Sequence, residues 1–134
     1  MSRCSRPDLD RALGFELSDQ QWEVVSAPLE PAVVVAGAGT GKTTSMAARV
    51  AWLVASGYVR ADTVLGLTFT NKAAAGLFGS MRSSLSRLEA AGLIDPEREA
   101  EHQGIDDDEG TGDPQVLTYN AFAKRIIDEH GVRL

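Results

Sequence analysis

The chain has 134 residues, one cysteine and a formal net charge of −6 at pH 7, which suits one small domain or part of a larger one. A single cysteine excludes disulfide bonds within the chain, and no stretch approaches the roughly 20 apolar residues of a membrane span. The N-terminus also lacks the apolar core of a signal peptide, so we expect a cytoplasmic protein with no membrane partner.

The charge is concentrated in one segment. Residues 95–113 contain nine of the 19 acidic residues and one of the 13 basic residues, so this segment carries −8 and the rest of the chain carries +2. The segment is polar, contains glycine and has no periodicity, which predicts a disordered acidic loop at about 95–114. Because the negative charge lies in this one segment, it does not exclude a nucleic-acid partner for the rest of the chain.

In the first half of the chain, the pattern predicts a strand between two helices. We expect residues 1–14 to be a flexible N-terminus and residues 18–27 to form a helix. Residues 32–36 are almost continuously apolar, which is typical of a strand buried on both faces. A helix over 42–56 follows, and its apolar face should consist of Met46, Val50, Leu53 and Val54.

The second half continues the alternation. We expect a buried strand over 64–69, a long helix over 72–91 and a strand over 115–119. A last helix should carry one stripe formed by Phe122, Ile126 and His130. Alternating strands and helices predict an α/β fold with a parallel sheet and flanking helices.

The segment "AVVVAGAGTGKTTS", residues 32–45, joins the first strand to its helix through a glycine-rich turn. Glycines leave backbone N–H groups open to a phosphate, and the positive end of the following helix attracts the same anion. This context predicts a phosphate-binding loop in which Lys42 reaches the β- and γ-phosphates and the Thr43 hydroxyl binds Mg²⁺. Ala36 replaces the first glycine of the usual pattern, and the alternative is a plain glycine-rich connection between strand and helix.

With alanine at that position, "AGAGTGKT" is similar to the Walker A segment of the UvrD/Rep/PcrA group of superfamily 1 DNA helicases. The resemblance implies a P-loop NTPase domain of the RecA-like type that uses ATP and Mg²⁺ and acts on single-stranded DNA. Lys42 and Thr43 are then the predicted catalytic residues. Thr44 stands where many relatives have an arginine near the adenine, so that contact is missing. The predicted nucleotide-binding residues are Gln21, Ala38, Gly39, Thr40, Gly41, Lys42, Thr43 and Thr44.

The segment "LSDQQWEVV", residues 17–25, resembles the Q motif of this group, which implies that Gln21 recognises adenine. An amide suits that role, because it presents one donor and one acceptor to the adenine N6/N7 edge. Ser18 and Gln21 also have the spacing of a helix capping box, which is a second interpretation. The two roles compete for one amide group.

Two further segments resemble the DNA-contacting motifs of the group. "LTFTNKAAAGL", residues 67–77, is similar to motif Ia, and "VLTYNAF", residues 116–122, occupies the place of motif Ib without its usual histidine and serine. An aromatic side chain in motif Ia would stack on a base. The alternative for motif Ia is a capped helix start with Phe69 in the core. The predicted DNA-binding residues are Phe69, Thr70, Asn71, Thr118 and Asn120.

The resemblance covers about residues 15–131, so we assign 15–134 to the N-terminal part of a RecA-like helicase domain. It stops before the acidic Walker B motif and before the second RecA-like domain that helicases of this group need. We therefore expect a larger parent enzyme whose remaining helicase domains are partners of this segment. A chain that has the Walker A segment but lacks the Walker B motif and the second domain should bind ATP but hydrolyse it poorly on its own.

The run from Met46 to Leu77 is also similar to the actinobacterial AdnB-type subunit, a helicase fused to a nuclease, which implies a second helicase-nuclease subunit as a partner. Two other functions stay open. A nucleotide kinase would need a basic lid where this chain is acidic. A P-loop nucleotide-binding module without motor activity would need no Walker B acids.

Overall fold

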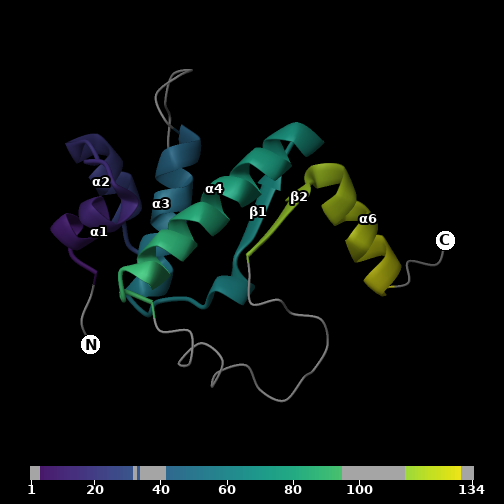
Figure 1. Ribbon diagram of the computed structural model, residues 1–134. Coiled ribbons are helices and arrows are strands. Elements are labelled where there is room, and N and C mark those ends of the chain that lie inside the picture. Colours follow the sequence, from purple (N-terminus) through teal and green to yellow (C-terminus); the bar gives the residue numbers. More distant parts are fainter. Residues whose placement is uncertain (1–3, 32, 34–41, 95–113, 131–134) are drawn as a thin grey trace, which may run out of the picture.

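The computed structural model describes residues 4–31, 33, 42–94 and 114–130. The two strands are β1 (Leu65–Thr68) and β2 (Gln115–Thr118), and a short 3₁₀ turn, η1, covers Ala61–Thr63. The helices are α1 (Arg6–Leu13), α2 (Asp19–Val25), α3 (Lys42–Ala55), α4 (Asn71–Ala90) and α6 (Tyr119–His130) (Figure 1). None of the helices in these ranges is long and apolar enough to cross a bilayer.

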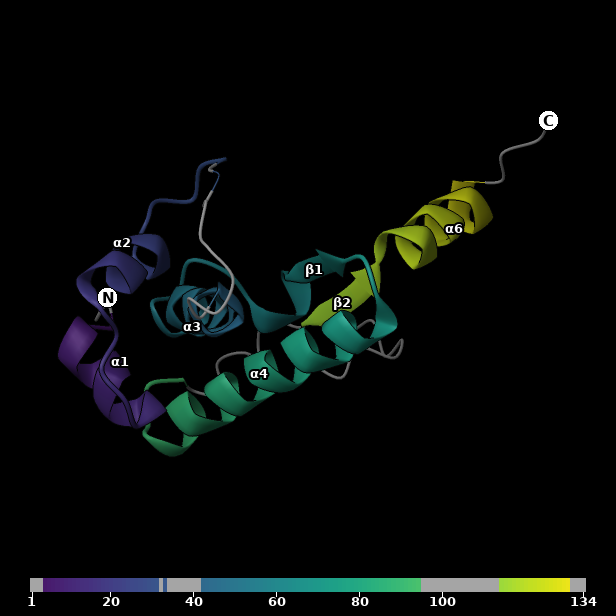
Figure 2. The same ribbon diagram turned by 90° about the horizontal axis from the view of Figure 1, so that it is seen from above.

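The strands β1 and β2 pair in parallel, with Leu65 opposite Gln115 and Thr68 opposite Thr118. The connection between them carries α4, which packs against both strands (Figures 1 and 2). The predicted parallel α/β fold with flanking helices is therefore confirmed. The predicted strand over 32–36, except Val33, lies outside the described residues, and so does the predicted acidic loop, except Pro114.

The strand β1 is only half-buried, although the sequence predicts a fully buried one. The Leu65 side chain is 42% exposed, and the other residues of β1 are partly covered. Among the described residues, β1 has one strand neighbour and α4 on one face. A Cβ added at Gly66 would lie 3.2 Å from Leu77 of α4, so this glycine permits the close approach of helix and sheet.

The buried face of α3 also differs from the predicted one. Met46 is 48% exposed, whereas Leu53 and Val54 are buried as expected. Alanines on the buried face allow α3 to pack closely against α2 and α4, and this packing buries a stripe that includes Trp52 and leaves Met46 exposed. The buried residues of α3 are Ser45, Ala47, Ala48, Ala51, Trp52, Leu53 and Val54.

The helix α1 is the main departure from the predicted fold, because residues 1–14 were expected to be flexible. The Leu9 and Leu13 side chains are buried in the core with Leu88 of α4. Local signals for α1 are present in the sequence. The Ser5 hydroxyl accepts from the Asp8 N–H at the N-cap, Pro7 lies in the first turn, and Gly14 ends the helix with a φ of +84°.

Cys4, two residues before this helix, is also held in place by hydrogen bonds. The Cys4 N–H donates to Ser56 Oγ at 3.3 Å, and the Cys4 carbonyl accepts from Trp52 Nε1 at 2.9 Å. Burial, with a smaller contribution from the negative charge of Asp8, raises the pKa of the Cys4 thiol to about 11. The thiol is therefore protonated at neutral pH and is a poor nucleophile.

The molecule has two ends joined by α4, which is 20 residues long and so spans about 30 Å. The helices α1, α2 and α3 gather at one end, and Arg87 near the C-terminus of α4 donates to the carbonyl of Leu13. The sheet and α6 lie at the other end, where α6 projects away from the remaining helices (Figure 2). Its Ile126 side chain, which lies on the stripe predicted for this helix, is 40% exposed.

Candidate nucleotide and DNA site

The first turn of α3 carries the predicted phosphate ligands. Lys42, Thr43 and Thr44 are its first three residues, and all three are exposed. The first turn contains no acidic residue, so the positive end of the helix is not neutralised by its own side chains. An exposed ammonium, an exposed hydroxyl and the N–H groups of a helix start fit a nucleotide phosphate with its metal ion. The loop residues Ala38, Gly39, Thr40 and Gly41 lie outside the described residues.

Gln21, the predicted adenine ligand, is the third residue of α2 and forms the capping box. The Ser18 hydroxyl accepts from the Gln21 N–H at 3.1 Å, and Gln21 Oε1 accepts from the Ser18 N–H at 2.9 Å. The capping interpretation is therefore confirmed. The Gln21 carbonyl oxygen has a second lone pair, and its NH₂ group carries two donors, so the amide keeps capacity for a base. Adenine recognition stays a prediction.

The capping box makes a direct prediction about stability. Ser18→Ala removes one of its two hydrogen bonds, so we expect the free energy of unfolding to fall by about 1 kcal/mol. Urea denaturation measures this change. Ser83→Ala is the matched control, because Ser83 is an exposed residue inside α4 and its replacement should change stability by less than about 0.5 kcal/mol. Equal losses in the two variants would contradict a stabilising cap.

The two segments that resemble DNA-contacting motifs meet at one edge of the sheet. Thr68 and Thr118 are opposite each other in register, so the residues that follow them, Phe69 and Tyr119, leave the sheet side by side. Their ring centroids lie 5.0 Å apart with an interplanar angle of 40°. The Phe69 side chain is 86% exposed and that of Tyr119 is 47% exposed.

This exposure excludes the alternative in which Phe69 belongs to the core. It also adds Tyr119, which was not among the predicted site residues. The signal for Tyr119 is in the sequence, because an aromatic residue follows each of the two strands directly. Two exposed rings at the ends of neighbouring strands form a surface on which a base can stack. We call this pair, Phe69 and Tyr119, the aromatic edge.

A helix begins close to each ring of the aromatic edge: α4 begins after Phe69 and α6 begins at Tyr119. The Thr70 hydroxyl accepts from the Ala73 N–H at 3.0 Å in α4, and the Thr118 hydroxyl accepts from the Ala121 N–H at 3.2 Å in α6. The capped helix start that was the alternative for motif Ia is therefore present, although Phe69 is not in the core. Each hydroxyl keeps its proton as a donor.

The two predicted asparagine ligands lie beside these caps. Asn71 is the first residue of α4 and Asn120 is the second residue of α6, and both are exposed. The structure thus brings all five predicted DNA-binding residues to one edge of the sheet.

One acidic pair follows two apolar residues, as Walker B acids do. The run Ile126–Glu129 contains Asp128 and Glu129, but it lies within α6 rather than at the end of a strand. Arg125 Nε is 3.1 Å from Glu129 Oε1, so that carboxylate has an exposed ion-pair partner on its own helix. In the described part of the chain, no three histidine, cysteine or acidic side chains form a metal-binding group.

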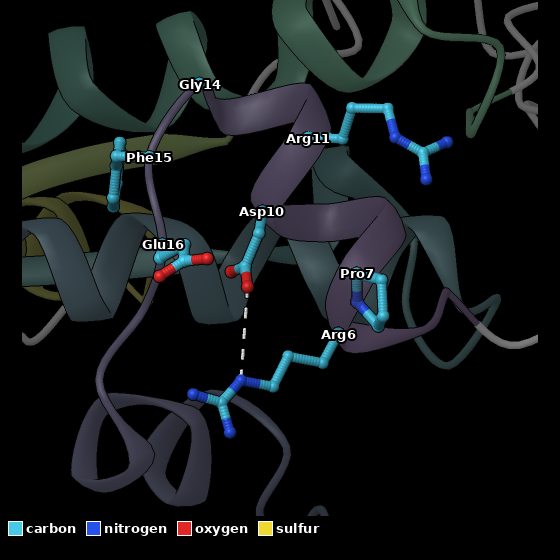
Figure 3. A pocket seen from close by; sticks show the side chains of 7 residues that line it. All are labelled: Arg6, Pro7, Asp10, Arg11, Gly14, Phe15 and Glu16. Atoms are coloured by element: carbon cyan, nitrogen blue, oxygen red, sulfur yellow. Dashed lines mark ion pairs between the residues drawn. The ribbon is translucent and has the colours of Figure 1, made fainter.

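An open hollow beside α1 is a weaker candidate site. Its lining includes two arginines, Arg6 and Arg11, and two acids, Asp10 and Glu16 (Figure 3). Arg6 Nε lies 4.0 Å from Asp10 Oδ2, and the Arg6 guanidinium also binds Asp19 Oδ1 at 2.8 Å. The two positive and two negative charges of the lining balance, so the hollow has no net charge that would favour an ionic ligand.

The family model described as "UvrD/REP helicase N-terminal domain" matches residues 17–134. The chain belongs to this family. The family has the RecA-like helicase fold, so the RecA-like character expected from the P-loop segment is confirmed together with the parallel α/β fold. The match begins within two residues of the predicted domain start at residue 15.

Individual relatives agree with the family. The chain is similar to "ATP-dependent DNA helicase UvrD2" of Mycobacterium tuberculosis, with 46% identity over 111 residues, which are 83% of this chain and 13% of the relative. It is similar to "DNA helicase II" of Escherichia coli, with 46% identity over 72 residues, or 54% of this chain and 9% of the relative. The chain therefore spans only about an eighth of the UvrD2 protein that it matches.

Proposed function

We propose that this UvrD/REP-type chain is the ATP-binding part of an ATP-dependent DNA helicase that moves along single-stranded DNA. ATP with Mg²⁺ would lie at the start of α3, with Lys42 on the phosphates, Thr43 on the metal and Gln21 on the adenine. Single-stranded DNA would cross the aromatic edge. The remaining helicase domains of a longer parent enzyme would complete both sites.

The observation that carries this proposal is the aromatic edge. A chain that only bound nucleotide would have no need for two exposed rings beside two helix N-termini, each with a capping threonine hydroxyl and an exposed asparagine. Stacking platforms of this kind bind single strands without reading their sequence. Backbone N–H groups and small polar side chains at helix starts suit phosphate contacts.

The test is a paired titration of the 134-residue chain. We expect weak binding of ADP–Mg²⁺ by calorimetry, and weak, salt-sensitive binding of an oligothymidine strand by fluorescence anisotropy, because the net charge of −6 opposes DNA. Phosphate release from ATP should stay near background, because neither of the two described strands leads into an Asp-Glu pair and the catalytic arginines would come from a second RecA-like domain.

The other two functions predict different results. Transfer of the γ-phosphate to a nucleoside monophosphate would support a nucleotide kinase. Nucleotide binding with no binding of single-stranded DNA even at low salt would support a module without motor activity. The narrower similarity to the AdnB-type subunit, and with it a second helicase-nuclease subunit as partner, stays a prediction.

A further inference from the structure

Arg49 makes an unusual set of contacts between two helices. It lies on α3 seven residues after Lys42, which is two helical turns, so the two side chains leave the same face of the helix about 10 Å apart along its axis. Its Nη1 atom lies 3.0, 3.2 and 2.8 Å from the carbonyl oxygens of Val24, Val25 and Ala27. Its Nη2 atom donates to the carbonyl of Pro28 at 3.1 Å.

These four carbonyls form the C-terminal end of α2 and the segment that leaves it. The last carbonyls of a helix have no partners within the helix, and they carry its negative partial charge. The helix α2 has no basic residue in its own last turn. Arg49 of α3 therefore provides both the donors and the positive charge that this end lacks. A lysine cannot replace it, because an ammonium group has one nitrogen and lacks the planar fork.

The helix α2 is attached at other points as well. The Trp22 ring meets Trp52 of α3 edge to face, with centroids 6.1 Å apart. At the N-terminal end, Arg6 donates to the Leu17 carbonyl at 2.8 Å, and Asp10 Oδ1 accepts from the Leu17 N–H at 3.1 Å. Since α2 has only seven residues, contacts at its two ends determine the orientation of the whole helix, including Gln21.

We propose that Arg49 is a positioning residue for base recognition: it holds the helix that carries Gln21 in register with Lys42 and Thr43 of α3. This inference rests on the proposed function, because it requires a nucleotide that spans the two helices. Its consequence is specific. Loss of Arg49 should weaken the discrimination between bases, while the affinity for the phosphates alone should stay the same.

The experiment measures the dissociation constants of ADP–Mg²⁺, GDP–Mg²⁺ and pyrophosphate–Mg²⁺ for the wild-type chain, Arg49→Met and Arg49→Lys. We expect the wild-type chain to bind ADP more tightly than GDP. In both variants the ratio of the GDP to the ADP dissociation constant should fall by about five- to tenfold, which corresponds to the loss of about one hydrogen bond. Pyrophosphate affinity should change less than about twofold. Arg87→Lys is the matched control, because it removes an arginine–carbonyl contact between α4 and α1 and leaves α2 intact.

A double-mutant cycle distinguishes positioning from general stabilisation. Gln21→Ala should remove the same preference, and adding Arg49→Met to it should have no further effect on the ADP/GDP ratio. If the wild-type chain binds no nucleotide, or if Gln21→Ala keeps the preference, the proposed function fails. If Gln21 carries the preference but both Arg49 variants retain it, or if they weaken pyrophosphate as much as ADP, the role of Arg49 is overturned.

Discussion

Lys42→Ala is expected to lower the affinity of the chain for ADP–Mg²⁺ by about 100-fold. Because the wild-type chain should itself bind ADP weakly, binding by the variant should be undetectable. A hydrogen bond to a charged group contributes about 1.5–3 kcal/mol, and each 1.4 kcal/mol is tenfold in affinity. The Lys42 side chain is exposed at the first residue of α3, so its removal should leave the fold unchanged. Calorimetric titration measures the affinity, and thermal unfolding checks the fold.

Lys124→Ala is the matched control for this change, because Lys124 is an exposed lysine on α6, far along the chain from α3. It removes the same charge and should leave ADP affinity unchanged. Equal losses for the two variants would mean that net charge, and not a phosphate site at α3, controls binding. Unchanged affinity in Lys42→Ala would remove the start of α3 from the nucleotide site.

The double variant Phe69→Ala/Tyr119→Ala is expected to reduce the affinity for oligothymidine by about 100-fold or more. Stacking of a base on an aromatic ring contributes about 1–3 kcal/mol, and two rings are removed. Neither ring is buried, so folding should be nearly unaffected. Fluorescence anisotropy at low salt measures the affinity. Phe69→Trp should retain most of it, because a tryptophan ring stacks as well.

Phe15→Ala is the matched control for the aromatic edge. Phe15 is 43% exposed and lies beside α1, at the other end of the molecule from the sheet edge. Its loss should leave DNA affinity unchanged, while nucleotide affinity should be the same in all these variants. A DNA affinity that survives loss of both Phe69 and Tyr119 would place the DNA-binding surface elsewhere.

The order and type of most elements followed from local patterns. The helix cap at Ser18, the end of α4 before Gly92 and the two short strands all appear where the sequence predicts them. These features depend on residues close together in the chain, so a short window contains the information. The proposed phosphate-binding segment was recognisable for the same reason, since its glycines, Lys42 and Thr43 all fall within residues 37–43.

Features that depend on contacts between distant residues could not be predicted in this way. The helix α1 has its own cap and end signals, but its place in the core depends on Leu88, some eighty positions away. The buried stripe of α3 is set by neighbours on two sides, which favoured alanines over Met46. The aromatic edge requires parallel pairing of β1 with β2, and the Arg49 contacts require α2 to end beside α3. Periodicity shows which residues share a face of one element, whereas the choice of partner for that face is made by packing across the whole fold.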